Sequence, residues 1–168
     1  MFRAYAVAVS AWEQRVDELW RSFDELDEAT FLTRMKALAE ELPDDSATAV
    51  FERASAFDST GREEEAVAHY RRALELGLDS SRRRRAVIQL ASSLRNVGKL
   101  EESIALLTAE REQPSDELDD AVAAFLALAL VDAGREREAA SLALAALAPH
   151  LPRYQRSLAS YAADLRRA

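Results

Sequence analysis

The chain has 168 residues, the size of one domain with a substantial core, and its four glycines and four prolines indicate a helical protein with few loops. It contains no cysteine, which excludes disulfides, thiolate chemistry and cysteine-ligated zinc. Its net charge of −8 disfavours non-specific attraction to nucleic acid or to an anionic membrane, so we expect neither as a partner.

The first residues resemble a secretory signal only faintly. A single arginine, Arg3, precedes a short apolar run that ends at Trp12, but Glu13 and Arg15 follow directly and no small-residue cleavage site is convincing. No window holds eighteen uninterrupted apolar residues, so no membrane span is expected. We predict a cytoplasmic protein, and the excess of arginine over lysine together with abundant alanine favours a bacterial source with a GC-rich genome.

Residues 1–45 are expected to form an N-terminal helical pair. Residues 3–24 carry apolar side chains at helical spacing, and Asp27 can cap a second helix. Asp44 and Asp45 are expected to cap the helix that follows. The pair has the length of a hairpin repeat but lacks its small residues and its glycine, so we interpret it as a degenerate repeat or a cap.

Residues 46–168 contain a repeated helical hairpin. Gly61, Gly98 and Gly134 lie 37 and 36 residues apart and mark the same turn in each repeat. The hairpins are expected at about residues 47–80, 84–117 and 120–152, followed by a capping helix at 153–168. A hairpin of this size cannot bury its own apolar face, so neighbouring hairpins must bury it for each other.

Small residues recur where the two helices of a hairpin must approach closely. They stand at equivalent places in the three repeats: Ala54, Ala91 and Ala127 in the first helices, and Ala66, Ser103 and Ala139 in the second. Larger residues at Phe57, Leu94 and Leu130 are expected to fill the space between hairpins. The pattern therefore predicts close packing within each hairpin and apolar packing between hairpins.

This pattern resembles the tetratricopeptide repeat, a helical hairpin of about 34 residues. The first repeat carries the family's residues at Ala54, Phe57, Gly61, Ala66, Tyr70 and Ala73. The second departs at Glu110, where a small residue is expected, and the third underfills the aromatic position with Ala143. The resemblance covers about residues 47–152 and is closest to short three-repeat bacterial members. It implies an all-α, right-handed superhelical stack that binds proteins and catalyses no reaction.

In that family the first helix of each repeat lines a concave groove that holds a peptide or a helix. If this chain follows the pattern, its partner-binding residues are Phe51, Ser55, Asp58, Arg85, Ile88, Gln89, Ser92, Arg95, Asn96 and Leu128. The residues from Arg85 to Asn96 offer hydrogen-bond donors suited to a peptide backbone or a carboxylate. Phe51, Ile88 and Leu128 are the expected apolar anchors. The alternative is that a neighbouring element or a second copy covers this face.

No catalytic residue, metal ligand or cofactor site is predicted. The acidic runs at 63–65 and 101–102 open helices, where acids favour the helix dipole and face solvent. The two histidines, His69 and His150, have no acidic ligand partner three or four residues further along the chain. No glycine-rich loop that would hold a phosphate is present.

Two further surfaces leave alternatives open. The basic run Ser81–Arg85 is expected to pair with nearby acids, although it could instead attract nucleic acid or an acidic tail. Apolar residues of the N-terminal helix, Phe2, Tyr5, Val9 and Trp12, could pair two copies of the chain, which would make it a self-associating scaffold and a homodimer.

Overall fold

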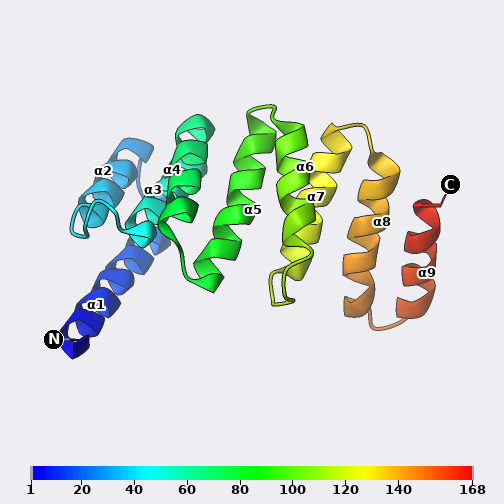
Figure 1. The fold of residues 1–168 in the computed structure, drawn as a ribbon, viewed down its shortest axis with the longest axis horizontal. Helices are drawn as coiled ribbons and strands as arrows, with labels where there is room; N and C mark the ends of the chain where they lie inside the picture. The colour runs from blue at the N-terminus through cyan, green and yellow to red at the C-terminus, as the bar shows by residue number, and fades with distance from the viewer. Residues whose placement is uncertain (1, 168) are drawn as a thin grey trace. The chain divides into compact units, whose positions relative to one another are not determined.

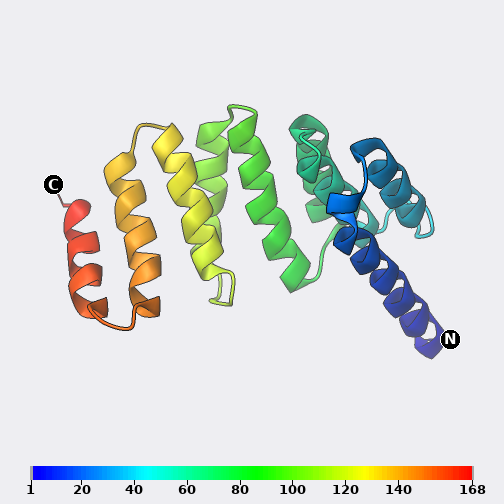
Figure 2. The ribbon, with the colours of Figure 1, turned by 180° about the vertical axis from the view of Figure 1, so that it is seen from behind.

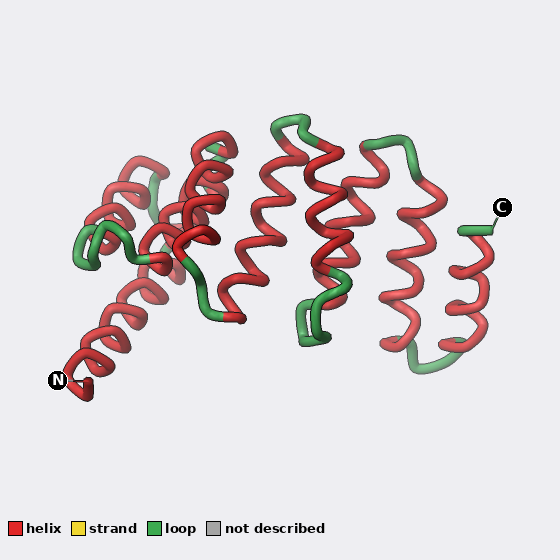
Figure 3. The backbone as a smooth tube through the Cα atoms, in the orientation of Figure 1, coloured by secondary structure: helices red, strands yellow, loops and turns green. Residues whose placement is uncertain are grey.

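Helices make up all the regular structure in the computed structural model, which describes the backbone of residues 2–167 and the side chains of residues 11–167. The helices are α1 (Phe2–Arg21), α2 (Glu28–Ala39), α3 (Ala47–Ser59), α4 (Glu63–Leu76), α5 (Ser80–Asn96), α6 (Leu100–Glu110), α7 (Asp119–Asp132), α8 (Glu136–Leu147) and α9 (Gln155–Leu165). Short 3-10 helices at Phe23–Glu25 and Ala148–His150 complete the order. Over residues 2–167 Figure 3 shows only helices and connecting loops, and the all-α class is confirmed.

Two helix ends differ from the prediction, each for a local reason. The Ser22 hydroxyl donates to the Leu19 carbonyl at 2.8 Å, so α1 ends before Phe23 and a 3-10 turn follows. The acids Asp44 and Asp45 do not cap α3, because Ser46 takes that position and its Oγ accepts from the Ala49 amide at 3.3 Å. The Asp27 cap is confirmed, since its carboxylate accepts from the Thr30 amide at 2.9 Å.

The chain forms two compact units, Met1–Arg82 and Arg83–Ala168, and the boundary between them falls within α5. The first unit contains α1 to α4, and the second contains most of α5 together with α6 to α9. The colour gradient of Figure 1 follows this order along the chain. Each unit has its own apolar core.

The core of the first unit joins the N-terminal helices to the first hairpin. Trp12, Val16 and Leu19 on α1 pack with Phe31 on α2, and the cluster extends to Ala56 on α3. Large rings fill the space beside it, and the Phe23 and Phe31 rings meet edge to face at 4.8 Å between centroids. Because α2 packs directly on α3, the N-terminal pair continues the series of packed helices.

Alanine lets the two helices of the first hairpin meet closely. Ala54 on α3 and Ala66 and Ala73 on α4 have no exposed surface. Tyr70 is equally buried, and its ring lies 6.1 Å from that of Phe51, between centroids. The small positions of the repeat therefore lie at the helix contact, as the sequence pattern predicts.

In the second unit buried serines add hydrogen bonds to the same close contacts. Ser103 on α6 donates to the Ala91 carbonyl of α5 at 2.7 Å, and Ser141 on α8 donates to the Ala162 carbonyl of α9 at 2.6 Å. All four of these residues are fully buried. Figure 2 shows α8 and α9 running side by side, and α9 packs along α8.

The three turn glycines share one conformation. Gly61, Gly98 and Gly134 have φ of 70°, 77° and 72°, in the left-handed region that glycine enters without steric cost. In each turn the next residue's amide donates back across the helix end, as Lys99 does to the Leu94 carbonyl at 2.8 Å. The glycines therefore set the angle at which each second helix begins.

We expect Gly98→Ala to lower the free energy of unfolding by about 1–2 kcal/mol, because an alanine in the left-handed region brings its Cβ too close to the adjacent carbonyl oxygen. Beyond its chain neighbours a Cβ at Gly98 would meet no atom within 4 Å, so the loss comes from the local backbone conformation and not from crowding by the rest of the chain. Chemical denaturation measures it. Gly98→Asn is the control and should recover part of the loss, since asparagine tolerates this conformation; equal losses would contradict the explanation.

Candidate docking surface

A polar strip on α5 consists of Arg85, Gln89, Ser92, Arg95 and Asn96. Arg85 and Asn96 are exposed, and the other three side chains are half-buried. Their spacing of three to four residues places them along one side of the helix. All five belong to the second unit, so the predicted donor strip is accessible along the C-terminal two thirds of α5.

Arg95 connects this strip to the next first helix. Its Nε donates to Asp132 Oδ2, at the end of α7, at 2.6 Å. The guanidinium is one quarter exposed, and its two terminal nitrogens make no hydrogen bond within the described part of the chain. The ion pair therefore orients Arg95 while leaving donors that another molecule can use.

An apolar strip on α7 lies beside this polar strip and consists of Ala124, Leu128 and Val131. Leu128 and Val131 are 46% and 48% exposed, whereas Leu126 and Leu130 of the same helix are 4% and 5% exposed. Half-exposed branched side chains that follow one another on a helix mark a surface open to contact. Leu128 is thus the predicted anchor that the structure leaves exposed.

The apolar strip forms one side of a groove whose other side is α8. The groove is lined by Ala124, Ala127, Leu128, Val131, Glu136, Ala139, Ala140 and Ala143. Seven of these eight residues are apolar, and five are alanines, whose short side chains leave the space open. The contribution of α8 is absent from the predicted site, because a repeat pattern alone does not show which small residues stay uncovered.

Phe51, Ser55 and Ile88 are not exposed to a partner, and the expectation of apolar anchors at Phe51 and Ile88 is corrected here. Phe51 is fully buried against Tyr70, Ser55 is 4% exposed, and Ile88 belongs to the core of the second unit. Helical spacing places these residues on the inward side of α3 and α5, where the rest of the unit covers them.

Asp58 is half-buried beside the Tyr70 phenol. The Tyr70 hydroxyl lies 3.3 Å from Ser55 Oγ and 3.4 Å from Asp58 Oδ2. Burial, followed by the charge of Asp58, raises the pKa of Tyr70 well above its usual value, so the phenol stays protonated and acts as a donor. These contacts of the Tyr70 hydroxyl connect α4 to α3, so Asp58 stabilises the hairpin in this structure.

Most arginines of the basic run Ser81–Arg85 form ion pairs with acidic residues, as the sequence indicates. Arg82, in the first unit, pairs with Glu13 and with Asp79. The Arg82 amide, more than its guanidinium, holds the pKa of Asp79 below its usual value. These contacts stabilise the first turn of α5 and attach it to α1 within the first unit.

In the second unit Arg83 and Arg84 enclose Glu110, the residue that departs from the family pattern. Arg83 Nη1 donates to Glu110 Oε1 at 2.9 Å, and Arg84 Nε lies 3.8 Å from the same oxygen. Glu110 and Arg84 are only 3% and 4% exposed. A carboxylate therefore replaces the expected small residue, and two guanidinium groups balance its charge.

Arg84 also holds the loop that leads to α7. Its Nη1 donates to the Pro114 carbonyl at 2.8 Å, and its Nη2 donates to Asp119 at 2.6 Å. The Ser115 hydroxyl, followed by the Asp116 amide and Arg84, holds the pKa of Asp119 below its usual value. This arginine thus joins the end of the second hairpin to the start of the third.

Trp12 is buried and cannot pair two copies of the chain through its ring. It is 2% exposed, and its Nε1 donates to the Leu38 carbonyl at 2.7 Å. The side chains of Phe2, Tyr5 and Val9 lie outside the described residues. The expectation that Trp12 contributes to a dimer contact is therefore wrong, because α2 already covers it.

The two histidines and the two acidic runs do not gather into one cluster among the described side chains. His69 Nδ1 lies 2.8 Å from the Glu65 carbonyl, and His150 Nε2 lies 2.7 Å from Asp120, an acid thirty residues away. The acids at 63–65 and 101–102 occupy the first turns of α4 and α6, as predicted. Among the described side chains no three potential metal ligands gather, and no described helix is long and apolar enough to span a membrane.

Antiparallel helix pairs with small contact residues and a glycine turn, repeated three times, define a protein built from helical hairpin repeats. A comparison with protein families matches residues 47–165 to the tetratricopeptide repeat. The chain belongs to the tetratricopeptide repeat family, whose domains are generally protein–protein interaction modules and typically non-catalytic. The match extends beyond residue 152 and includes α9. Searches among curated proteins and among solved structures find no significant match.

We expect Glu110→Ala to lower the free energy of unfolding by about 3 kcal/mol, because it leaves Arg84 buried with fewer partners. Thermal or urea unfolding followed by circular dichroism measures this. Adding Arg84→Met should recover part of the loss, since the uncompensated cation is removed as well. The exposed Glu112→Ala is the matched control and should change stability by less than about 0.5 kcal/mol; an equal effect would contradict the role of burial.

Proposed function

We propose that this chain is a protein-interaction module that holds an extended peptide or a helix of a partner protein against α5 and α7, the first helices of its second and third repeats. The proposed surface keeps those residues of the groove expected from the family pattern that are accessible, and leaves out the buried ones. The observation that carries the proposal is the exposed apolar strip on α7, where Leu128 and Val131 are about half exposed.

The apolar strip supplies affinity, but not enough by itself. Full burial of a leucine or valine side chain contributes about 1.5–3 kcal/mol, so covering the exposed halves of Leu128 and Val131 contributes about 2 kcal/mol in all. Micromolar binding requires about 8 kcal/mol. A partner must therefore also fill the alanine-lined groove beside α8 or reach the polar strip on α5.

The polar strip supplies orientation. The terminal nitrogens of Arg95 and the side-chain amide of Asn96 are donors on α5, and Arg95 is held by Asp132, which follows Val131 of the apolar strip. Donors fixed in this way suit the carbonyl oxygens of an extended peptide or a carboxylate on a partner helix. The partner that fits has an apolar side for α7 and acceptors for α5.

We expect Leu128→Asp to abolish partner binding, because the carboxylate would have to lose its hydration shell against an apolar surface. The partner is first captured from lysate with the wild-type chain and then titrated as a purified protein by calorimetry. Leu147→Asp is the matched control, since Leu147 is 48% exposed near the end of α8 but does not line the groove. It should bind the partner as the wild type does.

Other outcomes separate the alternatives. Equal binding by both variants would place the partner elsewhere and overturn the proposal. If the wild type recovers only more of itself, and its mass in sedimentation rises with concentration, then the self-associating scaffold is the better description. An Arg95→Ala, Asn96→Ala double variant should weaken partner binding without abolishing it, because the apolar strip remains.

A further inference from the structure

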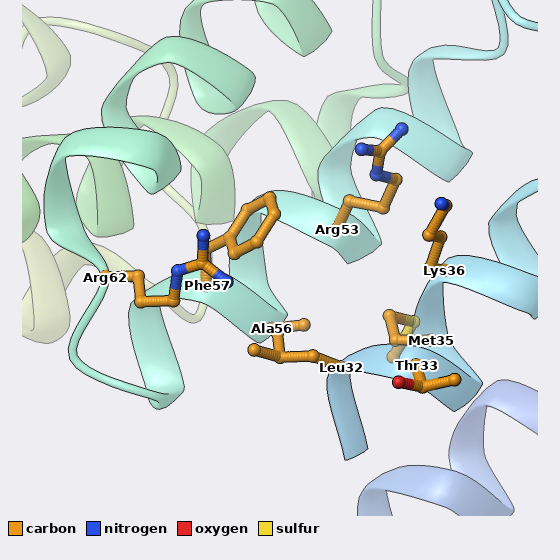
Figure 4. A pocket seen from close by; sticks show the side chains of 8 residues that line it. All are labelled: Leu32, Thr33, Met35, Lys36, Arg53, Ala56, Phe57 and Arg62. Atoms are coloured by element: carbon orange, nitrogen blue, oxygen red, sulfur yellow. The ribbon is translucent and has the colours of Figure 1, made fainter. Parts of the chain in front are cut away.

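A second pocket lies in the first unit, between α2, α3 and the start of α4, and Figure 4 shows the side chains that line it. Its lining residues are Leu32, Thr33, Met35, Lys36, Arg53, Ala56, Phe57 and Arg62. Met35 and Ala56 are each 1% exposed and belong to the core, so the floor of the pocket is apolar. Three of the lining residues are cations and none is an acid.

The three cations surround the apolar floor. In Figure 4 Arg62 lies over the ring of Phe57, while Arg53 and Lys36 extend their charged ends toward the same side of the pocket. The Arg62 guanidinium carbon is 4.8 Å from the centre of the Phe57 ring, a cation–π distance. An apolar cavity whose edge carries only positive charges raises the local concentration of anions, even in a chain of net charge −8.

Arg53 is the unexpected residue among these cations. Arg53 stands directly before the repeat alanine Ala54. In the second and third repeats the residues directly before the equivalent alanines are Leu90 and Leu126. Both leucines are 4% exposed and pack in the interior. Repeat packing thus requires an apolar residue at this position, and the first repeat places a half-buried guanidinium there instead.

Arg53 has no acidic partner among the described side chains. Glu52, beside it, accepts from Trp20 Nε1 at 2.9 Å and is engaged with α1. This differs from the buried Arg84 of the second unit, which has three acids within 4 Å. A partly desolvated cation without a counter-ion is unfavourable, and a carboxylate placed in the pocket would relieve that cost.

The other two cations, Lys36 and Arg62, are each paired with an acid on their own side of the pocket. Lys36 is 63% exposed and lies 3.6 Å from Glu40, a surface pair of adjacent helical turns that contributes little to stability. Arg62 bonds Glu65 through Nε and Nη2, which fixes its guanidinium over Phe57. The pocket therefore has one fixed cation, Arg62, one half-buried cation, Arg53, and one exposed cation, Lys36, around a hydrocarbon floor.

We infer that this pocket binds an acidic peptide segment of a partner protein, in which an aspartate or glutamate stands next to a large apolar side chain. The apolar side chain lies on Leu32 and Met35 beside the edge of Phe57, and the carboxylate accepts hydrogen bonds from Arg53 and Lys36. An inorganic anion alone would leave the hydrocarbon floor exposed, and an apolar peptide would leave Arg53 without a counter-ion.

This site is independent of the proposed surface on α5 and α7. All its residues lie in the first unit, and those on α2 precede residues 47–165, which match the repeat family. The failure of one proposal therefore leaves the other standing. A partner that uses both sites would carry an acidic segment in addition to the segment held by α5 and α7.

The test is an NMR titration of the full ¹⁵N-labelled chain with an acetylated, amidated peptide of sequence Glu-Leu-Glu-Phe. The Arg53 Nε–H and the Phe57 amide should shift and saturate, and Arg53→Leu should weaken binding at least about tenfold, the loss expected for a charge-assisted hydrogen bond. Because leucine stands at the equivalent position in the other repeats, this variant should unfold at the same temperature as the wild type or higher.

Arg34→Leu is the matched control, since Arg34 is an exposed arginine on α2 that does not line the pocket. It should leave binding unchanged, whereas Lys36→Gln, a surface change that does not threaten the fold, should weaken it. Equal binding of the Gln-Leu-Gln-Phe peptide, equal loss with Arg34→Leu, shifts of the same size with sulfate alone, or no saturable binding of the acidic peptide would each overturn the inference.

Discussion

The close approach of the two helices within each hairpin is the contact on which the rest of the structure depends. Alanine at Ala54 and Ala66, and serine at Ser103, let backbones meet with little side chain between them. Helices that are this close bury only a narrow face within the hairpin, so their remaining apolar residues must pack against the neighbouring hairpin. The left-handed turn glycines keep that geometry the same from one repeat to the next.

The two charged departures from the repeat pattern have different consequences. Glu110 stands where a small residue is expected, and the structure compensates it internally with Arg83 and Arg84. Arg53 stands where the other repeats have leucine, and no acid of the described chain compensates it. A buried charge that is paired contributes to the stability of the fold, whereas a half-buried charge without a counter-ion beside an apolar pocket favours a ligand there.

The accessible surfaces of the two units also differ in chemistry. The second unit exposes an apolar strip at Leu128 and Val131 beside the donors of α5, which fits a partner that is largely apolar on one side. The first unit offers an apolar pocket with a cationic edge, which fits an acidic segment. A family whose members share one fold thus acquires its specificity from the few residues that packing does not need.

The sequence by itself determined the helices, the turn glycines and the family, because these depend on local backbone preferences and on spacing that recurs along the chain. Only the tertiary structure decided which members of each helix face stay exposed. Phe51, Ile88 and Ala124 hold the same place in their repeats, yet the first two are covered and the third is exposed. The ion pairs of Arg83 and Arg84 likewise join residues 26 to 35 positions apart, which helical periodicity cannot bring together. Exposure and pairing depend on which neighbour covers a face, and that information is not local.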